Sequence, residues 1–161
     1  MADGLSASHP VEILDGDEVR RSFFPELGFS PADRDENVHR VGRLALLLAR
    51  HDVTVLVAVI APYRDARDRM RQLHAQAGVP YAEVWVDAPV DVCAERDVKG
   101  LYAMACRGEL TGLTGVDGPY EPPTGPELHL RTDRDDVVAC TAALARLVDR
   151  LTTGHLDLAD R

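Results

Sequence analysis

Apolar and polar residues form alternating blocks along the chain, and each block has the length of one strand or one helix. Four blocks are short, apolar and rich in β-branched residues, as strands are; they cover residues 11–15, 52–63, 80–89 and 128–132. Four other blocks have apolar residues at helical spacing; they cover residues 30–51, 64–78, 90–97 and 135–151. This order predicts an α/β domain with a mainly parallel sheet. We expect the runs 11–15 and 52–63 to be buried, the second as a central strand covered on both faces.

Local signals predict where several elements begin and end. Ser30 is a favourable N-cap and Pro31 suits the first helical position, whereas Gly78 is suited to close the helix over residues 64–78. Residues 101–126 differ from the rest because they contain five glycines and four prolines. Such turn chemistry predicts a long ordered loop or lid, which we place at about residues 99–126. We expect residues 1–161 to form a single domain that includes this lid.

Composition narrows the choice of partners. The formal net charge is -9, which argues against binding to nucleic acid or to an anionic membrane surface. No apolar run is long enough to cross a bilayer and no secretory signal is visible, so we expect a cytoplasmic location. Three cysteines without CxxC spacing and six histidines without metal-binding spacing favour neither disulfides nor zinc. Lys99 is the single lysine among 18 basic residues, so an anionic ligand would be held mainly by arginines.

Polar loops follow three of the predicted strands, at residues 15–20, 61–67 and 87–97. In a parallel sheet these loops lie at the carboxyl ends of the strands, where ligands bind. The first loop contains Asp15, Asp17 and Arg20. Two carboxylates can hold a magnesium ion through water or orient a hydroxyl, and an arginine can grip phosphate or sulfate. The alternative, equally open from these residues alone, is a turn followed by a helix N-cap.

Two further groups of polar residues are candidates for binding. Arg34, Asn37 and Arg40 recur at i, i+3 and i+6 on a predicted helix, where an arginine and an asparagine can read the phosphate and the base edge of a nucleotide. A solvated helix face is the more usual explanation of such a pattern. The single lysine, Lys99, indicates a requirement for a compact ammonium group, against the alternative of an ordinary surface charge.

Five segments in the right order resemble the adenylylsulfate kinase family, whose members phosphorylate adenosine 5′-phosphosulfate at its 3′-hydroxyl with ATP. They read "LDGDEVR", "LGFSPADRDENVHRVG", "VAVIAPYRDARDRMR", "EVWVDAPVDVCAERDVKGLYAMACRGELTGLTGVDGPYEPP" and "PELHL", within residues 11–132. The resemblance implies a three-layer P-loop kinase fold with a mainly parallel sheet. It also implies ATP and Mg²⁺ as cofactors and adenosine 5′-phosphosulfate as the substrate.

The resemblance also implies roles for individual residues. Asp15 and Asp17 match the catalytic carboxylates, with Asp15 close to the magnesium ion and the reacting hydroxyl. The substrate-binding positions implied in this way are Asp17, Arg20, Phe29, Arg34, Asn37, Ile60, Ala61, Lys99, Gly112 and Leu113. Phe29 matches the aromatic residue that stacks on the adenine. Many family members carry a serine at the position of Ala61; because alanine cannot accept phosphate, the resemblance implies direct in-line transfer.

The start of the sequence departs from the family pattern. Family members have a strand, a GxxxxGK[ST] loop and a helix before "LDGD", whereas here only "GLS" at residues 4–6 resembles the beginning of that loop. We therefore expect the first strand, the P-loop and the first helix to be missing and phosphoryl transfer to be impaired. The alternative function is a non-catalytic module that holds adenosine 5′-phosphosulfate or pairs with a complete kinase.

The position of this departure has consequences for folding and assembly. In the family's sheet the first strand lies in the middle, so its loss leaves backbone groups of two neighbouring strands without partners. The outcomes left open are that the neighbours close up, that another chain donates a strand, or that stability is marginal. The protein partners that we consider are a second copy in a homodimer, a complete kinase and ATP sulfurylase.

Overall fold

The fold is an α/β arrangement in which every strand runs parallel to its neighbour. The computed structural model describes residues 10–153, so the predicted loop remnant at residues 4–6 lies outside the described part. The elements in chain order are β1 (Val11–Asp15), α2 (Gly16–Phe23), α3 (Pro31–Ala49), β2 (Thr54–Ala58), α4 (Arg64–Gln76), β3 (Val84–Asp87), α5 (Val90–Arg96), α6 (Leu101–Cys106), β4 (Leu128–Arg131) and α7 (Val137–Thr152). In this part of the chain no helix is long and apolar enough to span a bilayer.

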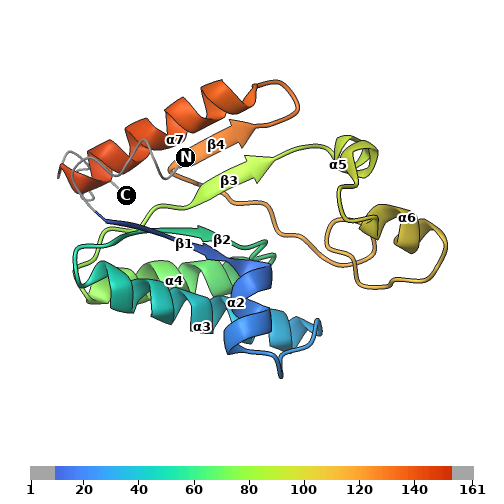
Figure 1. The fold of residues 1–161 in the computed structure, drawn as a ribbon, viewed down its shortest axis with the longest axis horizontal. Helices are drawn as coiled ribbons and strands as arrows, with labels where there is room; N and C mark the ends of the chain where they lie inside the picture. Colours follow the sequence, from blue (N-terminus) through green and yellow to red (C-terminus); the bar gives the residue numbers. More distant parts are fainter. Residues whose placement is uncertain (1–9, 154–161) are drawn as a thin grey trace.

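The strands form two separate parallel pairs. β1 pairs with β2, with Leu14 opposite Val57, and β3 pairs with β4, with Val86 opposite Leu130. Within residues 10–153 no ladder of hydrogen bonds joins the two pairs. All four strands point towards the side of the molecule where α2, α5 and α6 lie (Figure 1). The predicted α/β class and the parallel pairing are therefore confirmed, and the carboxyl ends of the strands share one side.

Helix α3 begins where the sequence predicts. Ser30 accepts a hydrogen bond from the backbone N–H of Asp33, whose side chain in turn accepts from the backbone N–H of Ser30, and Pro31 occupies the first turn. This capping box satisfies donors that the helix itself leaves free. The buried face of α3 then packs Val41 and Ala45 against the strand residue Leu14. The cap and the packing together hold α3 under the β1–β2 pair (Figure 1).

The prediction that β1 and β2 are buried strands is wrong in part. Ile13 in β1 is 46% exposed and Val57 in β2 is 40% exposed. The physical reason is that α2 and α3 pack against this pair of strands. Within residues 10–153, β1 and β2 are hydrogen-bonded to each other and to no third strand. A strand with β-branched residues on both faces needs cover on both faces to be buried, and here the cover is one-sided.

Candidate functional site

The candidate site begins where β1 and β2 end. Gly16 follows β1 directly, and a Cβ atom at this position would lie 3.0 Å from the backbone oxygen of Ala58 at the end of β2. Asp15, the last residue of β1, is the N-cap of α2: its Oδ1 accepts hydrogen bonds from the backbone N–H groups of Asp17 at 2.9 Å and Glu18 at 3.1 Å. The capping role left open by the sequence is therefore present. This capping role is compatible with the predicted role of Asp15 close to the reacting hydroxyl, because a carboxylate has a second oxygen.

Asp17 and Lys99, which both belong to the predicted site, form an ion pair. Lys99 lies in the glycine-rich segment, which we define as residues 99–126. Both side chains are largely exposed, and the hydrogen bond to Asp17 raises the pKa of Lys99. The pair brings the glycine-rich segment to the start of α2, although the two residues are 82 positions apart in the sequence. An exposed pair of this kind is weak, so an incoming anion can compete for the ammonium.

Arg20 and Phe29 form one wall of a cavity. The Arg20 guanidinium lies 4.9 Å from the centre of the Phe29 ring, and its Nη1 donates to the carbonyl oxygen of Gly28 at 2.5 Å. Burial, together with the charge of Arg34, lowers the pKa of Arg20. The cavity has a volume of about 390 Å³, and Asp17 also lines it. Phe29 is 69% exposed as a residue even with Arg20 over one face of its ring, so a flat aromatic ligand can reach the ring.

Arg34 joins helix α3 to the glycine-rich segment. Its guanidinium donates to the carbonyl oxygens of Phe29 at 2.8 Å and of Gly112 at 2.7 Å, and to the hydroxyl of Thr114. The carboxylate of Asp117 accepts from the backbone N–H groups of Gly112 and Leu113, each at 2.7 Å. The structure thus brings Gly112 and Leu113 to the same arginine as Phe29. Asp117 has no counterpart in the sequence-based prediction.

Asn37 lies one helical turn after Arg34 and is buried, with 5% exposure. Its Oδ1 has no hydrogen-bond partner among the described residues. An unpaired buried acceptor is costly, and it commonly marks a place where a ligand or a water supplies the missing donor. Arg40, the third residue of the same spacing, instead pairs with Glu26 and Glu36 on the surface. The solvated explanation therefore applies to Arg40, whereas ligand binding by Arg34 and Asn37 stays a prediction.

Ile60 and Ala61 lie in the loop between β2 and α4. Ile60 is 65% exposed, and Ala61 has a φ of 42°, a left-handed conformation that costs an L-residue free energy. The carbonyl oxygen of Ala61 accepts a hydrogen bond from Nη1 of Arg67 at 2.8 Å. Arg67 is missing from the predicted site, and sequence reasoning had little basis for including it, because "RDARDRMR" looks like a solvated helix face.

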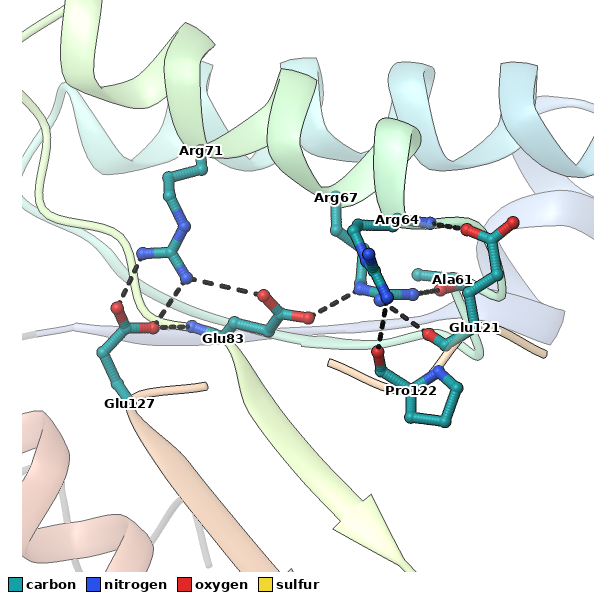
Figure 2. Close-up of polar contacts among 8 residues, drawn as sticks. All are labelled: Ala61, Arg64, Arg67, Arg71, Glu83, Glu121, Pro122 and Glu127. Carbon is teal, nitrogen blue, oxygen red and sulfur yellow. Dashed lines mark hydrogen bonds and ion pairs between the residues drawn. The ribbon is translucent and has the colours of Figure 1, made fainter. Parts of the chain in front are cut away.

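Arg67 belongs to a network that connects α4 to the beginning of β3 and β4 (Figure 2). Its Nε lies 2.6 Å from Oε1 of Glu83. Arg71, one turn later on α4, is hydrogen-bonded to both carboxylate oxygens of Glu127 at 2.6 and 2.9 Å. Glu127 also accepts from the backbone N–H of Glu83 at 2.7 Å. Two arginines of one helix thus hold the starts of two paired strands in place.

The network makes stability depend on pH in a specific direction. Burial alone would raise the pKa of Glu127, but the hydrogen bonds from Arg71 and from the Glu83 backbone outweigh it and lower the pKa below 4.5. A lowered carboxyl pKa means that the ionised group stabilises the fold above pH 4.5 and that this contribution is lost as the pH falls through the lowered value.

Glu127→Gln is therefore expected to reduce the free energy of unfolding at pH 7 by about 1.5 kcal/mol, the contribution of a hydrogen bond to a charged group. Urea unfolding at pH values from 7 to 3 checks this, and the difference from the unsubstituted chain should shrink as the pH falls below 4.5. Glu109→Gln is the matched control, because Glu109 pairs with Arg107 at the surface and should contribute little. Equal stability of the Glu127→Gln variant and the unsubstituted chain at every pH would contradict the prediction.

Within residues 10–153, the side chains do not make up a complete site for ATP and its magnesium ion. Among the described residues no group of three histidine, cysteine or acidic side chains could hold a metal ion. The sequence has no GxxxxGK[ST] loop, and its single lysine is paired with Asp17. We therefore derive no reaction step through ATP.

Parallel strands with ligand-binding side chains at their carboxyl ends are typical of P-loop kinases, and this is the class to which the fold belongs. A family model described as adenylylsulphate kinase matches residues 4–131. The chain belongs to the adenylylsulphate kinase family.

Individual relatives agree with this assignment. The adenylyl-sulfate kinase of Myxococcus xanthus strain DK1622 is 48% identical over 156 residues, which are 96% of this chain and 83% of that protein. The solved structure of the Mycobacterium tuberculosis APS kinase CysC in complex with AMPPNP and APS is 41% identical, with a TM-score of 0.79 over 90% of this chain and 80% of that one. The hexameric APS kinase from Thiobacillus denitrificans is 28% identical, with a TM-score of 0.61 over 98% of this chain and 27% of that one.

Proposed function

We propose that the chain binds adenosine 5′-phosphosulfate at an acceptor site, which we define as Asp15, Asp17, Arg20, Phe29, Arg34, Asn37, Ile60, Ala61, Lys99, Gly112 and Leu113. The observation that carries this proposal is the buried Oδ1 of Asn37, which has no partner within residues 10–153. An adenine amino group is a donor of the kind that this oxygen requires. Asn37 lies one turn from Arg34 on α3, so a base held there lies beside a cation that can bind its phosphosulfate or ribose.

The remaining residues of the acceptor site have complementary roles in the proposal. Phe29 offers an open ring face for stacking on the adenine. Arg20 lies against the same ring, where it can bind an anion with its guanidinium fork. The glycine-rich segment acts as a lid, because Arg34 holds Gly112 beside Phe29. Lys99 exchanges its exposed contact with Asp17 for the anionic substrate when the lid closes.

The second candidate function is the complete family reaction, transfer of the ATP γ-phosphate to the 3′-hydroxyl. Asp15 at the end of β1 favours it, because a carboxylate at this place can orient the attacking hydroxyl. Ala61 offers no hydroxyl for a phosphorylated intermediate, so the transfer would be direct and in line. We place binding first because the residues for the acceptor are present whereas the sequence has no GxxxxGK[ST] loop.

Isothermal titration calorimetry separates the two functions. Adenosine 5′-phosphosulfate is expected to bind the purified chain with one site, and ATP with MgCl₂ is expected to give no saturable heat. Adenosine 5′-monophosphate is the matched control ligand and should bind about tenfold or more weakly, because it lacks the sulfate that a charged donor would bind. Absence of saturable heat with adenosine 5′-phosphosulfate would refute the binding function. Saturable ATP binding together with steady product formation would favour the second function.

Assembly follows as a separate proposal. One structural relative is a hexamer by its own description, and the exposed apolar residues of β1 and β2 leave this chain with surface that an association would cover. We propose that the chain forms a homodimer or pairs with a complete kinase. Sedimentation velocity of the chain alone distinguishes these, since a homodimer persists without another protein.

A further inference from the structure

Ala61 is held in an unfavourable backbone conformation at a place where the acceptor site needs a fixed backbone. Its φ is 42°, and the next residue, Pro62, restricts Ala61 further because a residue before proline favours extended conformations. Pro62 has no N–H of its own to donate. The carbonyl oxygen of Ala61 is therefore the polar group through which its peptide unit can be held, and it is bonded to Arg67.

Arg67 is the most deeply buried arginine in the network of Figure 2, with 7% exposure. Its three guanidinium nitrogens have three different partners. Nη1 donates to Ala61, Nη2 donates to the carbonyl oxygen of Glu121 at 2.7 Å, and Nε faces the carboxylate of Glu83. A rigid planar fork with its nitrogens used in three directions fixes the positions of its partners relative to one another.

Glu121 connects the loop that contains Ala61 to the end of the glycine-rich segment. Besides accepting from Arg67, Glu121 donates its backbone N–H to the carbonyl oxygen of Pro62 at 2.9 Å. Its side chain accepts from the backbone N–H of Arg64 at 2.6 Å. The loop after β2 and the end of the glycine-rich segment are thus joined by the buried Arg67 guanidinium and by two further hydrogen bonds of Glu121.

We propose that Arg67 is a positioning residue of the acceptor site, which keeps Ala61 in its left-handed conformation and so places Ile60 and Ala61 where they meet adenosine 5′-phosphosulfate. Arg67 acts through Ala61 and does not itself touch the ligand. This inference rests on the proposed function, because it assigns Ile60 and Ala61 to the site that binds the ligand. Without the hydrogen bond from Arg67, Ala61 returns to the extended conformation that alanine before proline favours. Ligand binding must then restore the strained conformation, and this cost weakens the affinity.

A double-mutant cycle tests this mechanism. Arg67→Met is expected to weaken binding of adenosine 5′-phosphosulfate about tenfold, since it removes a charge-assisted hydrogen bond that holds a strained residue. In an Ala61→Gly background the same replacement should weaken binding by no more than about threefold, because glycine adopts positive φ without steric cost. Equal factors in the two backgrounds would show that Arg67 contributes general stability alone, and would overturn the proposal.

Two further variants keep the test decisive. Glu83→Gln removes the charge partner of Arg67 but leaves its bond to Ala61, so stability should fall while affinity stays within about twofold; a tenfold loss of affinity here would overturn the proposal. Arg67→Lys serves if the methionine variant fails to fold. A single ammonium cannot serve three partners, so we expect an intermediate loss that Ala61→Gly again reduces.

A measurement without ligand separates this inference from the proposed function. The ¹³C chemical shifts of Ala61 should report a left-handed residue in the unsubstituted chain and in Glu83→Gln, and an extended one in Arg67→Met. If the unsubstituted chain binds no adenosine 5′-phosphosulfate while these shifts behave as expected, the proposed function fails and the positioning of Ala61 stands. If the ligand binds but the shifts of Ala61 are the same in all three proteins, the inference alone fails.

Discussion

The 161-residue chain is expected to phosphorylate adenosine 5′-phosphosulfate at least about a thousandfold more slowly than the adenylyl-sulfate kinase of Myxococcus xanthus, its 48% identical relative. Phosphoryl transfer depends on cationic and backbone donors that position the phosphates and neutralise developing charge. Removing one such donor costs about a hundredfold to a thousandfold in rate, and a GxxxxGK[ST] loop supplies several.

Within residues 10–153 the cations of the proposed acceptor site and of the Arg67 network already have other partners. The single lysine of the sequence pairs with Asp17 in the acceptor site. Arg34 is bonded to Phe29 and Gly112, and Arg67 is bonded to Ala61 and Glu121. Arg34 and Lys99 are already assigned to the anionic groups of adenosine 5′-phosphosulfate in the proposed acceptor site, and Arg67 is buried with 7% exposure.

The rate is measured with both enzymes under one set of conditions, by following the conversion of adenosine 5′-phosphosulfate with ATP and MgCl₂. A chimera provides the matched control: the part upstream of Val11 is replaced by the corresponding part of the Myxococcus protein, and the rate should recover to within about tenfold of that enzyme. Recovery would locate the deficit upstream of β1 and leave the acceptor site intact. A rate of the unsubstituted chain within tenfold of its relative would refute the prediction.

Features that depend on neighbouring residues could be predicted from the sequence. Ser30 and Pro31 are adjacent in the sequence, and their chemistry places the beginning of α3 correctly. Gly78 follows α4 with a φ of 67°, as a glycine that closes a helix should. The alternation of strand and helix blocks likewise predicted parallel pairing, which both ladders confirm.

Features that depend on distant residues could not be predicted from local patterns. Burial of β1 and β2 depends on what packs against their second face, and no property of "VEILD" itself specifies that. Arg34 and Gly112 are 78 positions apart, and Lys99 is 82 positions from its partner in α2. The family resemblance placed these residues in one site, whereas their spacing in the sequence did not. Arg67 escaped prediction because its buried role is indistinguishable in sequence from the exposed arginines around it.

Replacing Arg34 with alanine is expected to weaken binding of adenosine 5′-phosphosulfate by about a hundredfold, which corresponds to about 2.7 kcal/mol. Arg34 is the residue that joins α3, Phe29 and the glycine-rich segment by hydrogen bonds. Its loss removes a cation that can bind the ligand, and it also releases Gly112 and Phe29 from their fixed relation. Both effects reduce affinity, because charge-assisted contacts are strong and preorganised sites lose less entropy on binding.

Two control variants separate the contributions. Arg43→Ala removes an exposed arginine of the same helix and should leave affinity within about twofold, since a distant surface charge is screened. Thr114→Val removes one partner of Arg34 and leaves the cation, so an intermediate loss of about threefold to tenfold is expected from one hydrogen bond. Calorimetry with adenosine 5′-phosphosulfate measures all three. An Arg34→Ala chain that binds as tightly as Arg43→Ala would show that the contacts of Arg34 stabilise the loop without serving the ligand.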